Sequence, residues 1–313
     1  MTTATLPQPA TDELPFDERF EALLEQGRVH LDAERYDDAL RCYERAEEAA
    51  RLQGERWAQD RAFVSRWAVL IATERGLAPE PFQRLREILM SGDDPVNCRL
   101  AAYNIARAYE FAKEHRKGLF YARIALDRSL ILEASDWIAS SHNQIGNFLL
   151  AESHFEQGLE EYQRALALLP VDQMSVRRAA IFDNLGYALV VVGRVKEGVE
   201  LLYRSLREFR SMGSRRETIL PHLSLCYALL ELGRFRHALK HGAVALALAE
   251  EAEEPDSIKH ALFLLGEAAQ QAGDPAEARS IFVRLQERYF PGASYLPDVL
   301  LTVDVRKLIN LKA

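Results

Sequence analysis

The chain has 313 residues, of which 48% are hydrophobic and 27% charged, ordinary values for a folded globular protein that exclude wholesale disorder. Its 47 acidic residues outnumber the 39 basic ones, and the net charge of -8 argues against a nucleic-acid-binding protein, which normally carries a basic surface. No apolar run approaches the roughly 20 residues that span a bilayer, and the first 15 residues lack a signal-peptide pattern. We therefore expect a cytoplasmic protein without membrane contact.

The first 15 residues precede any repeating pattern, and we expect them to form a disordered arm. From residue 16 onward, small residues recur every 39 or 40 positions, at Ala39, Ala78, Gly118, Gly158, Gly198, Ala238 and Ala278. A second column lies about seven positions further on, at Ala46, Leu85, Ala125, Ala165, Ser205, Ala245 and Leu285. A third column lies upstream, at Gly27, Ala106, Gly146, Gly186, Cys226 and Gly266. A period kept this strictly indicates a repeat architecture.

Each repeat divides into two helical patterns separated by turn residues such as Gly233. Ser214 with Glu217 predicts a capping box that opens a helix, and Asp274 before Pro275 predicts another helix start. A single helix pair cannot bury its apolar face, whereas stacked pairs share one continuous core. The sequence therefore predicts an all-α protein, an α-solenoid of about seven helix pairs over residues 16–293.

The pattern resembles the tetratricopeptide repeat. The resemblance is carried by the spacing of His142, Ile145, Gly146, Leu149, Phe155, Gly158, Tyr162, Ala165 and Pro170, and in part by the Leu-Gly pairs at 185–186 and 265–266. The repeat departs from the family in its length of about 40 rather than 34 residues, and in its second unit, where Arg66 replaces a small residue. The longer unit is similar to those of Pins-type adaptors, kinesin light chains and bacterial peptide-sensing regulators. The resemblance implies a right-handed superhelix that binds proteins and does not catalyse reactions.

Members of this family generally bind partners in a concave groove lined by the first helix of each pair. The resemblance places that groove at Tyr103, Asn104, Arg107, Asn143, Gln144, Asn147, Asp183, Asn184, Tyr187 and Tyr227. Asn and Gln amides both donate and accept hydrogen bonds, so a column of them can hold the backbone of an extended peptide. Tyr and Arg are frequent anchor residues at interfaces. The alternative is that the amides bridge neighbouring helices and that the tyrosines only pack.

Other chemistry finds little support in the sequence. His237 and His241 lie one helical turn apart but lack a third metal ligand, a pattern typical of solvated histidines. Cys226 occupies a small-residue position and is expected to be a buried structural thiol. No nucleophile turn and no phosphate-binding glycine loop occurs. We therefore expect no catalytic residue, no metal and no cofactor, and thus no enzyme.

Residues 294–313 lie outside the repeat and are rich in apolar side chains. The exposed end of a solenoid needs a cap, which this segment can supply. Alternatively, the segment docks on a partner or joins two copies of the chain. The leading hypothesis is an adaptor that binds a protein or an extended peptide and no nucleic acid. The alternatives are a peptide-sensing regulatory switch and a subunit assembled into a larger complex through this tail.

Overall fold

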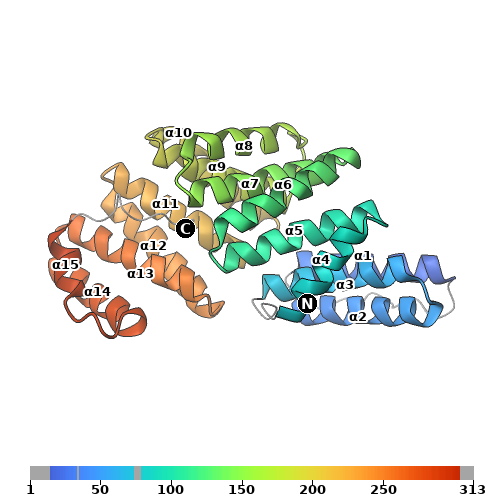
Figure 1. The fold of residues 1–313 in the computed structure, drawn as a ribbon. Coiled ribbons are helices and arrows are strands. Elements are labelled where there is room, and N and C mark those ends of the chain that lie inside the picture. Colours follow the sequence, from blue (N-terminus) through green and yellow to red (C-terminus); the bar gives the residue numbers. More distant parts are fainter. Residues whose placement is uncertain (1–14, 34, 74–78, 304–313) are drawn as a thin grey trace, which may run out of the picture. The chain divides into compact units, whose positions relative to one another are not determined.

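The computed structural model describes residues 15–33, 35–73 and 79–303, and in these ranges the chain forms α-helices, one short 3-10 helix and no strand (Figure 1). The first helices are α1 (Phe16–Asp32), α2 (Tyr36–Gln53), α3 (Arg56–Ala72), α4 (Pro79–Ser91), α5 (Pro95–Phe111) and α6 (His115–Ile131). They are followed by α7 (Ser135–Ala151), α8 (Phe155–Ala167), α9 (Val176–Val191), α10 (Val195–Ser211) and the 3-10 helix η2 (Arg216–Thr218). The last are α11 (Ile219–Glu231), α12 (Phe235–Glu251), α13 (Pro255–Gln271), α14 (Pro275–Tyr289) and α15 (Leu296–Thr302). The prediction of an all-α solenoid is confirmed.

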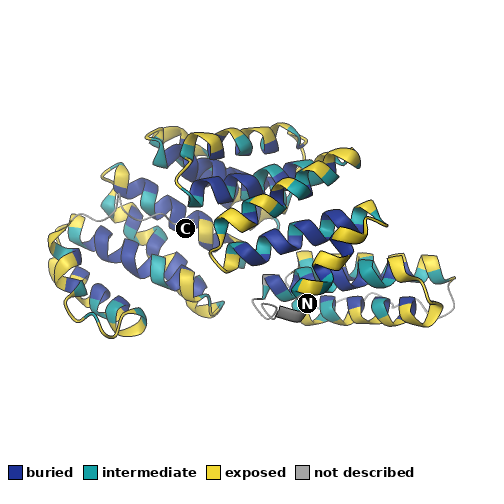
Figure 2. Cartoon of the chain, viewed as in Figure 1, coloured by how far each residue is buried: buried dark blue, intermediate teal, exposed yellow. Residues whose placement is uncertain are grey.

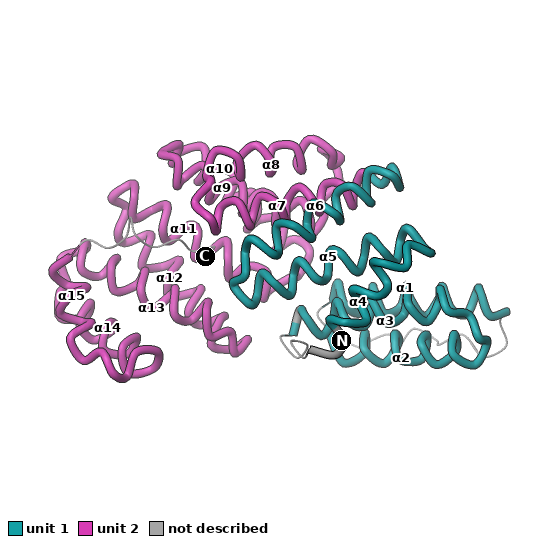
Figure 3. Tube along the Cα trace, viewed as in Figure 1, with its two compact units in different colours: residues 1–134 teal, residues 135–313 magenta. Residues whose placement is uncertain are grey.

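The described helices fall into two compact units, one ending at Ala134 and the other beginning at Ser135 (Figure 3). Unit 1 contains α1 to α6, and unit 2 contains α7 to α15. In most repeats the two helices of a pair pack against each other, as α5 does on α6 and α9 on α10. The second repeat differs, because α3 packs mainly against α2 and α5, and α4 mainly against α5. This is the repeat in which the sequence pattern is broken.

The first and third repeat columns form close contacts inside the helix pairs. Every described member of the columns is buried. A Cβ atom on Gly198 of α10 would lie 2.5 Å from the carbonyl oxygen of Gly186 on α9. The two backbones are therefore so close that only a glycine fits at this position. At Gly146, a Cβ atom would lie 2.5 Å from the ring of Tyr162. The constant period of the sequence is therefore the period of the helix–helix contacts.

We expect Gly198→Leu to lower the free energy of unfolding by about 1–3 kcal/mol, because the added side chain meets backbone rather than a side chain that can move aside. Urea denaturation followed by circular dichroism measures the change. The matched control is Lys196→Leu, an exposed position in the same turn of α10. A Gly198→Leu protein as stable as the wild type would show that α9 and α10 do not approach in this way.

Helix ends follow local side chains where the sequence supplies them. Asp274 accepts a hydrogen bond from the backbone N–H of Glu277 at 3.0 Å, which confirms the predicted start of α14. The capping box predicted at Ser214 is wrong. The backbone N–H groups of Gly213 and Ser214 bond back to Arg210 and Phe209, so these residues close α10, and α11 begins only at Ile219 after η2.

A buried ion pair fixes the connection between α8 and α9. Arg178, at the start of α9, donates from Nη2 and Nε to Glu208 of α10 at 2.7 and 3.2 Å, and the two side chains are only 7% and 5% exposed. Its remaining nitrogen, Nη1, donates to the backbone carbonyl oxygens of Pro170, at 3.0 Å, and Val171. One guanidinium therefore joins α9, α10 and the preceding loop.

The segment after the last repeat packs on it as far as it is described. Leu300 of α15 is buried in the core around α13 and α14, and Gln270 of α13 donates to the carbonyl oxygen of Leu301 at 2.8 Å. The predicted arm over residues 1–15 falls almost wholly outside the described residues, as do residues 304–313 of the predicted tail.

Candidate functional site

The ten residues predicted to line a groove lie on α5, α7, α9 and α11, the first helices of their pairs. Three of them belong to unit 1. Asn104 is buried and donates from Nδ2 to the carbonyl oxygen of Val64 at 2.8 Å, which joins α5 to α3. Tyr103 and Arg107 are half-buried, and the guanidinium of Arg99 lies 4.5 Å from the centre of the Tyr103 ring. In unit 1, the amide therefore bridges helices while the tyrosine and the arginine reach the surface.

The other seven residues belong to unit 2, where two asparagines of α7 are fixed by their neighbours. Asn184 of α9 donates from Nδ2 to Oδ1 of Asn143 at 2.9 Å. The hydroxyl of Tyr162 donates to Oδ1 of Asn147 at 2.9 Å. Asn143 and Asn147 are half-buried and lie one turn apart on the same face of α7. Both amides thus receive a hydrogen bond from inside the protein and hold a fixed orientation.

Four of the predicted residues lie in the interior of unit 2. These are Gln144, Asp183, Asn184 and Tyr187. Helix α9 is buried on nearly all sides by α7, α8, α10 and α11 (Figure 2). Tyr187 is only 1% exposed. The half-buried ring of Tyr227 lies 5.9 Å from the ring of Tyr187. The surface that remains consists of Asn143 and Asn147 on α7 and Tyr227 on α11, on either side of α9.

Next to this surface, His142 of α7 approaches Glu161 of α8, with 2.6 Å between Nδ1 and Oε2. Burial alone would raise the pKa of Glu161. The hydrogen bond to His142 and the positive charge of Arg164 outweigh that effect and hold the pKa below its usual value. The carboxylate is therefore charged at neutral pH and holds the His142 ring in place.

Two histidines form a contact that the sequence does not reveal. Nδ1 of His222, on α11, lies 2.9 Å from Nδ1 of His241, on α12, and Nη2 of Arg210 lies 3.2 Å from Nε2 of His222. Burial lowers the pKa of His222 to about 4, with help from the charges of His241 and Arg210. Burial, together with electrostatic interactions with Arg210 and His237, likewise lowers the pKa of His241 to about 4. Both rings are neutral at physiological pH.

This pair corrects the expectation that His237 and His241 are both solvated. His237 is exposed, but His241 is half-buried against His222, which lies 19 residues upstream on the neighbouring helix. The two rings meet because of how α11 and α12 are oriented about their own axes, which the sequence does not show. Cys226 is fully buried as predicted, and burial raises the pKa of its thiol to about 12. In the described ranges, no three His, Cys, Asp or Glu side chains are placed to share a metal ion.

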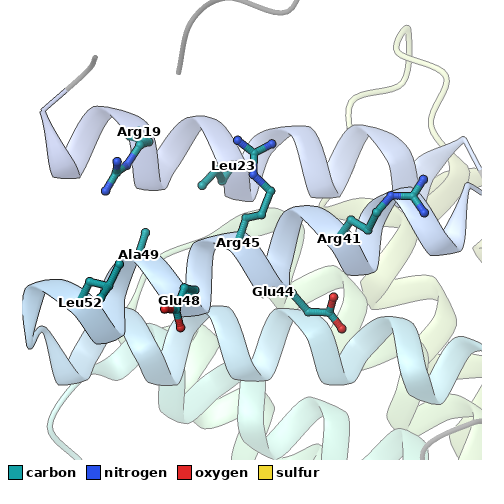
Figure 4. A pocket seen from close by; sticks show the side chains of 8 residues that line it. All are labelled: Arg19, Leu23, Arg41, Glu44, Arg45, Glu48, Ala49 and Leu52. Atoms are coloured by element: carbon teal, nitrogen blue, oxygen red, sulfur yellow. The ribbon is translucent and has the colours of Figure 1, made fainter. Parts of the chain in front are cut away.

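An open groove of about 450 Å³ runs along α1 and α2 in unit 1 (Figure 4). Arg19 and Leu23 line the groove on the α1 side. The residues that line it on the α2 side are Arg41, Glu44, Arg45, Glu48, Ala49 and Leu52. Glu48 pairs with Arg51, and Arg41 pairs with Asp38. Because both signs of charge alternate and are paired locally, this groove has the character of a solvated helix surface.

No protein-family model matches the chain. A solved structure of a Rap protein complexed with competence and sporulation factor is similar over 92% of this chain and 80% of that chain, with a TM-score of 0.70 and 15% identity. The apo form of the quorum sensor NprR from B. thuringiensis is similar over 91% of this chain and 82% of that chain, with a TM-score of 0.65 and 14% identity.

A signal-transduction ATPase with a tetratricopeptide repeat sensor, from Pyrococcus horikoshii, is similar over 91% of this chain and 44% of that chain, with a TM-score of 0.58 and 12% identity. These likenesses confirm that the chain has the tetratricopeptide-repeat solenoid fold. In sequence, the outer dynein arm-docking complex subunit 4 of Danio rerio is 21% identical in a match of 172 residues that covers 51% of this chain. The match spans 35% of that relative, about a third of its length.

Proposed function

We propose that this protein is a non-catalytic adaptor that binds an extended segment of a partner protein along the first helices of its repeats. In unit 2 the contact residues are Asn143, Asn147 and Tyr227. Tyr103 and Arg107 offer further contacts in unit 1. A cytoplasmic location belongs to the same proposal. Among the described helices, none combines the length and the apolar character that crossing a lipid bilayer requires.

The fixed amide of Asn143 is the observation that carries this proposal. Its Oδ1 atom accepts from Asn184, which leaves its Nδ2 group to donate hydrogen bonds at the surface. A backbone carbonyl of an extended peptide is a suitable acceptor. Tyr227 adds an aromatic ring supported from below by Tyr187. Because these groups are ordered before binding, the entropy cost of binding falls mainly on the partner.

The proposal is tested by selecting peptides from a displayed random library on the full-length protein. We expect the double variant Asn143→Ala/Tyr227→Ala to bind the selected peptides about tenfold or more weakly, a loss of at least 1.4 kcal/mol. The matched control is Gln163→Ala/Tyr203→Ala, which removes an amide and a tyrosine from exposed positions on α8 and α10. Selected peptides that bind the double variant and the wild type equally well would contradict the proposal, as would a library that yields no binder.

A sensing role is the second candidate. It is favoured by the likeness to a Rap protein in complex with a signalling factor and to a quorum sensor. Under this alternative, a selected peptide binds to the protein and also changes its conformation. Small-angle X-ray scattering with and without the peptide separates the two, because a rigid adaptor keeps the same scattering curve apart from the added peptide. An assembly role is supported by the likeness to a docking-complex subunit.

A further inference from the structure

Unit 1 contains a second open groove, of about 450 Å³, whose lining is entirely basic and aromatic. It lies where α4, α5 and α6 meet, and its lining residues are Arg86, Tyr109, Arg116, Lys117, Phe120 and Tyr121. We call it the basic-aromatic groove. No carboxylate lines it, whereas the groove along α1 and α2 contains two.

The aromatic side of the groove is a stack of rings with one ring exposed. Tyr109 stacks on Tyr121 at 5.7 Å between ring centres and meets the edge of Phe82 at 5.5 Å. Phe120 packs edge-on against Tyr121 at 5.3 Å and remains 61% exposed. Three of these four rings are held in place by their neighbours, while Phe120 presents apolar surface to any ligand in the groove.

The charges of the groove are held against these rings. Arg86 donates from Nη2 to the hydroxyl of Tyr109 at 2.8 Å, and Nζ of Lys117 lies 5.6 Å from the centre of the Tyr109 ring. The Tyr109 hydroxyl accepts this hydrogen bond and thereby orients the guanidinium. Lys117 also pairs with Glu114, but both side chains are well exposed, and solvent weakens such a pair.

The first turn of α6 departs from what helix stability alone favours. It carries His115, Arg116 and Lys117 and no acid, although positive charge is unfavourable at a helix N-terminus. The residue two repeats later in the same register as Lys117 is Glu197, the acid in the first turn of α10. Local rules are typically broken where a residue serves a function.

We propose that the basic-aromatic groove binds an acidic peptide segment of a partner protein, with an apolar side chain between its carboxylates. The carboxylates would pair with Arg86 and Lys117, and the apolar side chain would cover Phe120. Charge complementarity supports this occupant, because the groove concentrates positive charge on a protein whose net charge is -8. This site is independent of the surface on α7 and α11 and lies in the other unit.

The test uses the full-length protein and a fluorescein-labelled peptide of sequence Glu-Glu-Phe-Glu-Glu, with binding followed by fluorescence anisotropy. We expect binding that weakens as salt is added, since screening reduces charge pairing. Replacing the central Phe of the peptide by Ser, or all Glu by Lys, is expected to weaken binding about tenfold or more.

Three variants and one control locate the site. Arg86→Gln and Lys117→Glu are expected to reduce affinity about tenfold or more, and Phe120→Ala about threefold or more. Lys117→Glu also introduces an acid into the first turn of α6, where negative charge is favourable, so the protein is expected to stay folded. The matched control, Lys196→Glu, changes an exposed lysine in the equivalent turn of α10 and is expected to leave the affinity unchanged.

Several results would overturn the proposal. They are a lack of binding at about 1 mM peptide, equal binding of the Glu and Lys peptides, and equal affinity of Arg86→Gln and the wild type. ATP that displaced the peptide and bound more tightly would assign the groove to nucleotides instead. Asn143→Ala/Tyr227→Ala leaves this groove intact, so the two binding proposals fail separately.

Discussion

Glu208→Gln is expected to lower the free energy of unfolding by about 3–5 kcal/mol, because it leaves the guanidinium of Arg178 buried without its counter-charge. The pair is almost completely shielded from water, and Arg178 uses both Nε and Nη2 on this one carboxylate. Glutamine keeps the shape of the side chain but loses its charge and one of its two acceptor oxygens. Urea denaturation at neutral pH measures the effect.

A surface pair provides the matched control for this prediction. Arg215 and Glu251 lie 2.9 Å apart but are 70% and 59% exposed, so Glu251→Gln is expected to cost less than about 1 kcal/mol. The double variant Arg178→Met/Glu208→Leu is expected to regain most of the loss. It cannot regain all of it, because the carbonyl groups of Pro170 and Val171 lose their donor. A Glu208→Gln protein that unfolds like Glu251→Gln would show that water reaches the pair.

Acid is expected to destabilise unit 2 through His222 and His241. Their pKa values are about 4 in the folded protein, below the usual 6.5. Between these two pH values the unfolded chain binds more protons at the two histidines, so their contribution makes the free energy of unfolding fall as the pH drops from about 6.5 towards 4. Above about pH 6.5 their contribution is constant. Each pKa unit corresponds to about 1.4 kcal/mol, which makes the combined effect several kcal/mol.

Urea denaturation at intervals from about pH 7.5 to 4.5 tests this slope. His241→Phe keeps an aromatic ring against Tyr203 and removes one of the two titrating groups, so we expect about half of the slope to disappear. His154→Gln, at an exposed histidine before α8, is the control and is expected to keep the wild-type slope. Equal slopes for His241→Phe and the wild type would contradict the assignment, because carboxylates would then account for the whole acid response.

Much of the fold could be predicted because the repeat period reports helix contacts directly. The column of small residues that includes Gly198 marks these contacts, and at Gly198 only a residue without a side chain fits against Gly186. The exposure of the groove residues was harder to predict, because it depends on how many helices surround each one. Helix α9 did carry a signal: after Arg178 its only charged residue is Asp183, and a helix that is apolar on all sides is normally buried.

Pairs between helices lay beyond sequence reasoning. Glu208 follows Arg178 by 30 residues, and His241 follows His222 by 19. Neither separation corresponds to neighbouring turns of one helix, since in each pair the two residues lie on different helices. Whether their side chains meet depends on how each helix is rotated about its axis. The basic-aromatic groove has the same origin, since Arg86, Tyr109 and Lys117 come from three different helices.

The pairing of neighbouring helices also bears on how the chain acquires its structure as the ribosome makes it. In most repeats a helix finds its main partner in the helix that precedes or follows it, so a hairpin is complete about 40 residues after it begins. Such short sequence separations favour rapid folding, and domains generally fold as units during synthesis, starting from the N-terminus. Unit 1 ends at Ala134, so its core can close while most of unit 2 is still untranslated. Newly made apolar faces are then covered soon after they emerge, which limits their time for aggregation.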